Sequence, residues 1–212
     1  MNPKPATPPF ADPAATWNQR FASDDYHFGT APNTWMSEQS HIWQPGSRVL
    51  CVADGEGRNS VWLAGQGLSV DAFDIADAGV AKAQRLAAAR GVTVNYATAD
   101  CDAHDWPLAA YDGVAAIFVQ FADPLMRQRL FAHIIASLKP GGTLLLLGCT
   151  PKQLDYRTGG PPFVSHLYTP ELLREAFVEL EILALHEYEA EISEGQGHSG
   201  NSALIRLVAR RF

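Results

Sequence analysis

Short apolar segments alternate with helical segments along most of this chain, and this alternation limits the fold more than any other feature. Residues 48–53, 69–74, 92–97, 113–118 and 143–147 read as strands, and residues 76–90 and 124–138 have helical periodicity. Continuously apolar strands separated by helices are typical of a parallel sheet that is covered on both faces. We therefore expect an α/β fold with a mostly parallel sheet.

Both ends of the chain depart from this alternation. Residues 1–12 carry four prolines and are predicted to be a flexible leader, and a short helix follows from Pro13. Asn33 is well placed to cap a second short helix. Residues 180–191 and 202–210 read as two long strands joined by a glycine-rich loop, so we expect an antiparallel pair at one edge of the sheet.

Composition and charge narrow the range of partners. The 212 residues are 47% hydrophobic and 18% charged, which suits one sizeable core. The formal net charge of −7 gives no attraction to phosphate backbones or anionic lipid, so neither nucleic acid nor membrane is expected as a partner. We see no signal peptide and no apolar run of ~18 residues, and expect a cytoplasmic protein. Cys51, Cys101 and Cys149 lack metal-ligand spacing, so we expect reduced thiols and no metal site.

The segment VLCVADGEGRN, residues 49–59, is the first sign of a ligand site. A buried strand runs directly into Gly55-Glu56-Gly57, and a helix follows. Glycines let a backbone approach a ligand closely, and a helix N-terminus offers free N–H donors. In an open parallel sheet, ligands bind in the crevice at the carboxyl ends of the strands. A plain tight turn would require the same glycines, so this segment by itself is weak evidence.

Two aspartates follow the next two predicted strands. Asp74 stands about 20 residues after Gly55, where a carboxylate can accept hydrogen bonds from both hydroxyls of a ribose. Asp100, followed by Cys101, can accept a hydrogen bond from the exocyclic amine of adenine. Each aspartate has an ordinary alternative, because Asp74 could cap the next helix and Asp100 could stabilise a turn. The glycine turn and both aspartates in this order form a much stronger pattern than any one of them.

With these residues, the sequence resembles the class I S-adenosylmethionine (SAM) methyltransferases, and among them the branch related to tellurite-resistance and thiopurine methyltransferases. The segments that carry the resemblance are YHFGTAPN (26–33), ADGEGRN (53–59), LKPGG (138–142) and TGGP (158–161). The family fold implies a Rossmann-like, seven-stranded, mostly parallel sheet with helices on both faces and an antiparallel C-terminal strand. It also implies a single methyltransferase domain over residues 13–212, with a helical lid over about residues 13–46.

The resemblance also implies a binding site for the cofactor SAM. The predicted cofactor-binding residues are Ala53, Asp54, Gly55, Glu56, Gly57, Asn59, Asp74, Ile75, Asp100, Cys101 and Gln120. The family usually has an acidic residue where this chain has Cys51, and a glycine where it has Ala53. We expect Asp54, inside the turn, to take over the role of the acidic residue.

The acceptor side of the site is expected to be formed by loops. Methyl transfer from SAM requires the protein to align the nucleophile, to exclude water and, for oxygen or nitrogen acceptors, to remove a proton. His198 and Tyr26 are the predicted catalytic residues, and His27, Arg157 and Glu194 are the predicted substrate-binding residues. His198 could act as a general base near neutral pH, or could be an exposed histidine of a hairpin. A thiolate acceptor needs no strong base.

Together these features predict a methyltransferase for a small-molecule acceptor (a thiol, a metalloid or a small aromatic compound) that acts as a monomer or a weak homodimer. A SAM-binding module without catalysis is the alternative, motivated by Cys51 and Ala53. A nicotinamide-dependent oxidoreductase is disfavoured, since the turn is not GxGxxG and Asp54 and Glu56 would repel a pyrophosphate. A nucleic-acid amino-methyltransferase is also disfavoured, because residues 119–124 lack the Asn/Asp-Pro-Pro-aromatic signature.

Overall fold

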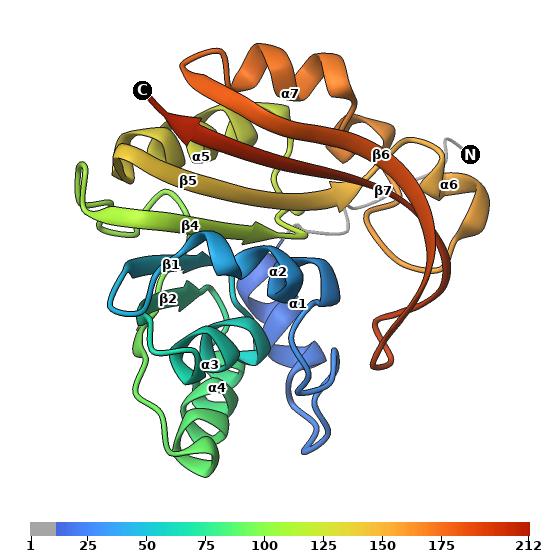
Figure 1. The fold of residues 1–212 in the computed structure, drawn as a ribbon. Helices are drawn as coiled ribbons and strands as arrows, with labels where there is room; N and C mark the ends of the chain where they lie inside the picture. Colours follow the sequence, from blue (N-terminus) through green and yellow to red (C-terminus); the bar gives the residue numbers. More distant parts are fainter. Residues whose placement is uncertain (1–11) are drawn as a thin grey trace, which may run out of the picture.

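The computed structural model describes residues 12–212, whose strands form one sheet with helices on both faces (Figure 1). The strands are β1 (Arg48–Val52), β2 (Ser69–Asp74), β3 (Asn95–Thr98), β4 (Tyr111–Ile117), β5 (Leu138–Cys149), β6 (Leu180–Glu194) and β7 (His198–Arg211). They lie in the order β3-β2-β1-β4-β5-β7-β6. Strands β1 to β5 pair in parallel, whereas β7 is antiparallel to both β5 and β6. The predicted Rossmann-like α/β sheet with an antiparallel C-terminal strand is confirmed.

Several of the helices begin where the sequence supplies capping side chains. They are α1 (Pro13–Arg20), α2 (Thr34–Gln39), α3 (Arg58–Gly65), α4 (Asp77–Arg90), α5 (Pro124–Ser137), α6 (Gln153–Tyr156) and α7 (Pro170–Ala176), with 3-10 turns at Ser40–Ile42 and Val164–His166. Asp12 caps α1, Asn33 caps α2, Asp123 caps α5 and Thr169 caps α7 through side-chain oxygens. The cap predicted at Asn33 is therefore confirmed. Residues 1–11 of the predicted leader lie outside the described residues.

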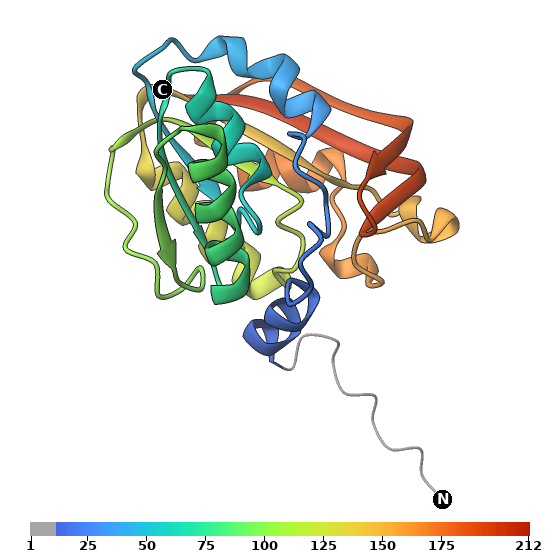
Figure 2. The same ribbon diagram turned by 90° about the horizontal axis from the view of Figure 1, so that it is seen from below.

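The two faces of the sheet carry separate apolar layers. Leu50 and Val52 of β1 point toward α5 and α7, whereas Val49 and Cys51 point toward α2 and α3. Figure 1 shows α3 and α4 beside β2, α5 beside β5 and α7 beside β6, and Figure 2 shows the same arrangement from below. Both faces of the central strands are buried, which explains why these strands are apolar without alternation.

Several strands differ in their bounds from the sequence prediction. β3 begins at Asn95 rather than at residue 92, because Gly91 ends α4 in a left-handed conformation and residues 92–94 complete the turn. β5 begins at Leu138 rather than at residue 143, since Leu138 already pairs with Tyr111 before an irregularity in the register. The β6–β7 hairpin is paired up to Glu194 and His198, so both strands are longer than predicted.

The side chain of Trp43 packs very closely against the backbone of Gly113 in β4, near the middle of the sheet. The indole of Trp43 lies against this glycine, and its Nε1 donates to the Thr143 hydroxyl at 2.7 Å. A Cβ at position 113 would lie 2.2 Å from two ring atoms of Trp43. Trp43 is also 5% exposed, so its ring has little room to move away.

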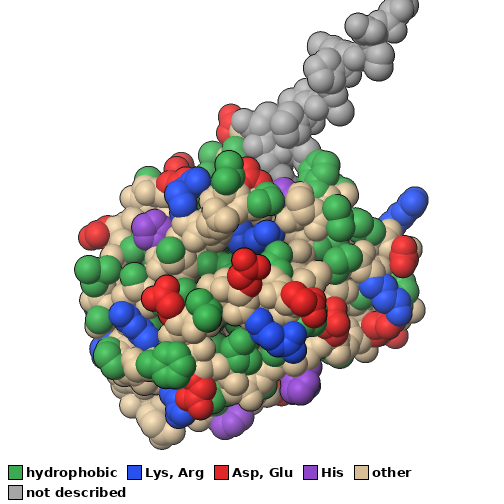
Figure 3. All heavy atoms as spheres, turned by 90° about the horizontal axis from the view of Figure 1, so that it is seen from above, with side chains coloured by type: hydrophobic (Ala, Val, Ile, Leu, Met, Phe, Trp, Pro, Cys, Tyr) green, Lys and Arg blue, Asp and Glu red, His purple; other side chains and the backbone are tan. Residues whose placement is uncertain are grey.

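The surface carries charges of both signs. Figure 3 shows acidic and basic side chains interspersed among hydrophobic ones on the face seen from above. Among residues 12–212, no helix is long and apolar enough to cross a membrane.

We predict that Gly113→Ala destabilises the protein by about 1–3 kcal/mol, because the new methyl group overlaps the indole of Trp43. Chemical denaturation would measure this loss. Gly65→Ala is the matched control, since a Cβ at the end of α3 meets no heavy atom within 4 Å. Equal stability of the two variants would contradict the close packing of Trp43 on β4.

Candidate active site

Two non-glycine residues with left-handed backbone mark the carboxyl ends of neighbouring strands. Ala53 follows β1 with φ 49°, and Phe118 follows β4 with φ 58°. The strand order reverses between β1 and β4, and ligands of open α/β sheets bind at this switch point. Left-handed conformations cost non-glycine residues of order 1 kcal/mol and cluster at functional sites. The backbone therefore marks this edge of the sheet as the candidate site.

The glycine turn after β1 is held in place by contacts on both sides. Gly55 and Gly57 have φ of 61° and 88°, which other residues rarely adopt. A Cβ at Gly57 would lie 2.6 Å from the Cβ of Ala83, so this glycine also allows α4 to pack against the turn. On the other side, the ring of Phe21 would lie 3.3 Å from a Cβ at Gly55. The first residues of the predicted cofactor loop therefore pack against both α4 and the residue that follows α1.

Asp74 joins the ends of β1 and β2. Its Oδ2 accepts the N–H of Gly55 at 2.8 Å, and its Oδ1 accepts the N–H of Ala76 at 2.9 Å, so it also stabilises the start of α4. The side chain is buried, and this burial raises the pKa of its carboxyl group. Each oxygen keeps a second lone pair for a hydroxyl donor. The predicted ribose contact of Asp74 is compatible with this geometry and stays a prediction. The predicted cofactor contact of the half-buried Ile75 beside it also stays a prediction.

Asp54 is a second carboxylate inside the turn. It accepts hydrogen bonds from the Ser60 hydroxyl and, at 3.3 Å, from the Ser60 N–H. Burial raises the pKa of Asp54 to about 7, and the nearby charge of Asp74 acts in the same direction. In the part of the chain that the structure describes, neither Asp54 nor Asp74 forms an ion pair. Two adjacent carboxylates of this kind fit a ligand that brings positive charge and hydroxyl donors, as SAM does.

The side chain of Glu56 points away from the turn and toward the loop between α1 and α2. This N-terminal loop comprises residues 21–33. The carboxylate of Glu56 forms an ion pair with Lys82 of α4, and both side chains are 2% exposed. Its Oε2 also accepts the N–H groups of His27 at 2.7 Å and Phe28 at 3.4 Å. A direct contact of Glu56 with the cofactor stays a prediction.

The next polar residues of the motif also hold this loop. Asn59 Oδ1 accepts the N–H of Asn33 at 2.9 Å. Arg58 pairs with Glu194 of β6 at 2.8 Å, and Glu194 also accepts from the Asn33 amide at 2.7 Å. Glu194 was predicted to bind substrate, and the structure places it in a nearly buried ion pair at the rim of a groove of about 240 Å³. Its substrate role stays a prediction.

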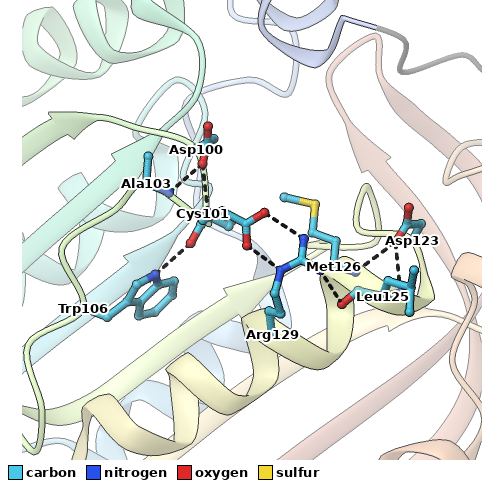
Figure 4. Close-up of polar contacts among 9 residues, drawn as sticks. Asp100, Cys101, Ala103, Trp106, Asp123, Leu125, Met126 and Arg129 are labelled. Atoms are coloured by element: carbon cyan, nitrogen blue, oxygen red, sulfur yellow. Dashed lines mark hydrogen bonds and ion pairs between the residues drawn. The ribbon is translucent and has the colours of Figure 1, made fainter.

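Asp100 and Cys101 lie in the loop after β3 (Figure 4). Asp100 Oδ1 accepts the N–H groups of Asp102 and Ala103 at 2.8 and 2.7 Å, so the turn interpretation applies to this oxygen. Cys101 is buried, burial raises the pKa of its thiol to about 12, and its carbonyl accepts from the Trp106 indole. These hydrogen bonds hold the loop in one shape. The adenine contact stays a prediction.

Gln120, shortly after the end of β4, connects neighbouring loops through its side-chain amide. Its amide nitrogen donates to the carbonyls of Cys149 and His166 at 2.8 and 3.1 Å, and its Oε1 accepts the Cys149 N–H at 2.5 Å. These bonds occupy the side chain and fix the loop after β5 beside the loop after β4. The predicted contact of Gln120 with the cofactor stays a prediction.

The predicted acceptor residues are not equivalent in the structure. His198 is 4% exposed, its Nε2 lies 3.1 Å from the Ser202 hydroxyl, and its ring packs edge-on against Phe118. The alternative of an exposed hairpin histidine is therefore wrong, and burial lowers the pKa of His198. The Tyr26 hydroxyl donates to a backbone carbonyl of α4 at 3.1 Å, and Arg157 is exposed at the end of α6. The catalytic roles of His198 and Tyr26 and the substrate role of Arg157 stay predictions.

Sequence reasoning missed several residues that shape this site. Lys82 lies in an alanine-rich helix, Ser60 follows the motif, and Phe118 ends an ordinary apolar strand. Only Lys82 could have been noticed in the sequence, because it is a lone lysine between apolar residues of a predicted helix. Within residues 12–212 no group of three His, Cys, Asp or Glu side chains could hold a metal ion, and all three cysteines are free and buried.

Comparisons with known proteins agree with this geometry. A family model described as a methyltransferase domain matches residues 49–142. The thiopurine S-methyltransferase of Azotobacter vinelandii is 33% identical over 174 residues, which cover 69% of this chain and 75% of the relative.

Two solved structures share the fold. TehB from Haemophilus influenzae has a TM-score of 0.70 at 17% identity, covering 94% of this chain and 67% of that one. Magnesium protoporphyrin IX methyltransferase from Synechocystis PCC 6803, with bound SAH, has a TM-score of 0.62 at 20% identity, covering 94% and 83%.

The fold and the glycine turn define a class I, Rossmann-like methyltransferase. The chain belongs to the SAM-dependent methyltransferases, in the group that includes thiopurine S-methyltransferase. It is therefore an enzyme with SAM as its cofactor, rather than a nicotinamide-dependent oxidoreductase.

We predict that Asp54→Asn changes the pH dependence of stability. The folded-state pKa of about 7 lies above the ordinary value of 3.8, so the native state loses stability as pH rises between these values. The substitution should remove this loss and raise the free energy of unfolding at pH 8 on the order of 2 kcal/mol. Urea denaturation at pH 5 and pH 8 would measure it.

Asp112→Asn is the control with the opposite sign. Asp112 bonds to Lys139, and its pKa is lowered, so this carboxylate adds stability above its ordinary pKa. Its removal should lower stability at pH 8. An Asp54→Asn variant that follows the wild-type pH profile would contradict the burial of this carboxylate.

Proposed function

We propose that this enzyme methylates a small, apolar acceptor at a soft atom, such as the sulfur of an aromatic thiol or a metalloid. The observation that carries this proposal is an aromatic cluster beside the glycine turn. Trp17 and Phe21 stack at 5.4 Å between ring centroids, and His27 and Phe28 pack edge-on at 4.7 Å. Aromatic faces favour flat, apolar partners over strongly hydrated ones. The name of the Azotobacter relative, an S-methyltransferase of thiopurines, supports the same acceptor class.

On the donor side, two buried carboxylates would interact with the charged and hydroxyl groups of SAM. When bound, SAM supplies a methyl group that is already activated on a sulfonium. Asp54 would offset the positive charge of the methionine end, and Asp74 would accept from the ribose hydroxyls. Glycine at position 55 would let the turn keep its left-handed backbone beside the ligand.

On the acceptor side, the enzyme would have to align the acceptor atom and would need little acid–base chemistry. A thiolate acceptor has no proton to lose, so the residues around it would need only to align its sulfur with the methyl group that SAM supplies. A buried, neutral His198 beside Phe118 would bound the acceptor pocket and could take a proton from a neutral thiol. The N-terminal loop would exclude water from the reacting atoms.

We predict that wild-type protein binds SAM and S-adenosylhomocysteine, but not NAD, in isothermal titration calorimetry. Asp74→Asn removes a charged acceptor worth about 1.5–3 kcal/mol, so the dissociation constant for SAM should rise roughly 10- to 100-fold. Asp71→Asn is the matched control, because Asp71 of the same strand bonds to Arg48 and Tyr111 instead. Equal weakening by both substitutions would remove the specific role of Asp74.

We predict that aromatic thiols are methylated faster than the matching phenols. With thiols at pH 8, His198→Asn should change kcat by less than about threefold, because a thiolate requires no base. With phenols, the same substitution should lower any measurable rate by about 100-fold or more. Product formation would be followed by mass spectrometry. A 100-fold loss with thiols would mean that the reaction depends on proton removal by His198.

A further inference from the structure

Lys82 is a buried cation whose contacts all lead to the N-terminal loop or to the glycine turn. Its Nζ donates to the carbonyls of Ser23 at 2.8 Å and Asp25 at 2.6 Å, and it forms the ion pair with Glu56. The ring of Tyr26 lies 4.9 Å from the same Nζ. A lysine is almost never this deeply buried unless its charge is paired. One side chain of α4 thus joins the loop to the turn.

Glu56 completes the connection from the opposite side. Its Oε2 accepts the N–H groups of His27 and Phe28, and its other oxygen faces Lys82. The carbonyl of His27 accepts the N–H groups of Gln196 and Gly197 at the tip of the β6–β7 hairpin. The backbone of His27 is therefore bonded to the glycine turn on one side and to the hairpin on the other.

The two helices beside the loop differ in how firmly they are anchored. The helix α1 has 8 residues and buries none of them, whereas α2 buries Trp35 and Met36, so the loop is anchored by apolar packing mainly at its C-terminal end. Residues 22–32 form no helix or strand. Segments with few buried apolar contacts open at low free-energy cost. The position of the loop thus depends strongly on the polar contacts of Lys82 and Glu56.

A buried ion pair is a poor way to stabilise a fold. Desolvation offsets most of the attraction between the charges, and an apolar pair of similar volume is often equally or more stable. What such a pair adds is specificity, because a buried charge is tolerated only in an arrangement that places its counter-charge beside it. Such a pair is suited to positioning a segment that has to close over a ligand.

We propose that Glu56 and Lys82 form a latch that positions the N-terminal loop over the glycine turn for the methyl donor. They are positioning residues, and the proposal rests on the donor binding at this turn, as in the proposed function. Because Glu56 lies between Gly55 and Gly57, the loop and the cofactor-binding backbone are held by the same carboxylate. Closing the loop and shaping the turn then become one event, with a single set of contacts to break when product leaves.

The test compares Lys82→Met and Glu56→Gln with wild type in the full chain. Hydrogen exchange of residues 23–28, measured without ligand, should become at least about tenfold faster in both variants. The KM for SAM should rise about tenfold or more, while kcat at saturating SAM changes less than threefold, because a closed loop adds binding energy but touches no reacting atom. Lys139→Met is the matched control, since Lys139 pairs with Asp112 in a half-exposed position away from the loop.

The double variant Lys82→Met/Glu56→Met separates positioning from simple stability. An apolar pair should recover the melting temperature that either single substitution lowers. The latch predicts that exchange of residues 23–28 stays fast and the KM for SAM stays high even so. Recovery of exchange and KM together with the melting temperature would overturn the proposal, as would a folded Lys82→Met variant with wild-type exchange and KM.

Failure of the latch and failure of the proposed function would give different results. If Lys82→Met does not fold, Glu56→Gln decides, because the amide oxygen can still accept from His27 while the charge that holds Lys82 is lost. Wild-type protein that fails to bind SAM would overturn the proposed function. The exchange measurements would then still show whether Lys82 and Glu56 hold the loop, because they contain no ligand.

Discussion

The left-handed backbone after β1 is the constraint on which the rest of the site depends. Three residues within five positions, Ala53, Gly55 and Gly57, have φ between 49° and 88°. This reverses the chain tightly enough for α3 and α4 to pack close to the strand ends, and for Asp74 to reach the Gly55 N–H. Ala53 adopts a conformation that glycine adopts at no steric cost, so the sequence departure from the family is accommodated as local strain.

This turn divides the work between its backbone and its side chains. The backbone forms the reversal at the carboxyl end of β1, whereas Glu56, Arg58 and Asn59 reach outward to the N-terminal loop and the hairpin. The same short motif therefore shapes the end of the strand and holds the loop beside it. Substitutions in its polar residues are expected to alter loop position before they alter the turn itself.

Electrostatics explains why this sheet suits SAM. Asp54 and Asp74 lie close together at the switch point, and burial raises the pKa of both. Two neighbouring carboxylates would repel a pyrophosphate, but a ligand with a sulfonium and an ammonium group relieves their repulsion. The proposed acceptor side is different, with aromatic rings and a buried histidine, and this contrast is the reason for proposing a charged donor and an apolar acceptor.

Local patterns in the sequence determined the α/β class, the glycine turn, Asp74 and the cap at Asn33, because periodicity, capping and tight turns depend on neighbouring residues. Strand ends were less well predicted, since β5 and the hairpin extend through pairing with distant partners. Only the tertiary structure decided which polar side chains form their hydrogen bonds and ion pairs with other residues of the protein. Glu194 meets Asn33 across 161 residues, Lys82 reaches the N-terminal loop from α4, and His198 is buried rather than exposed. The partners and burial of a side chain depend on the packing of segments far apart in the chain, which local sequence does not encode.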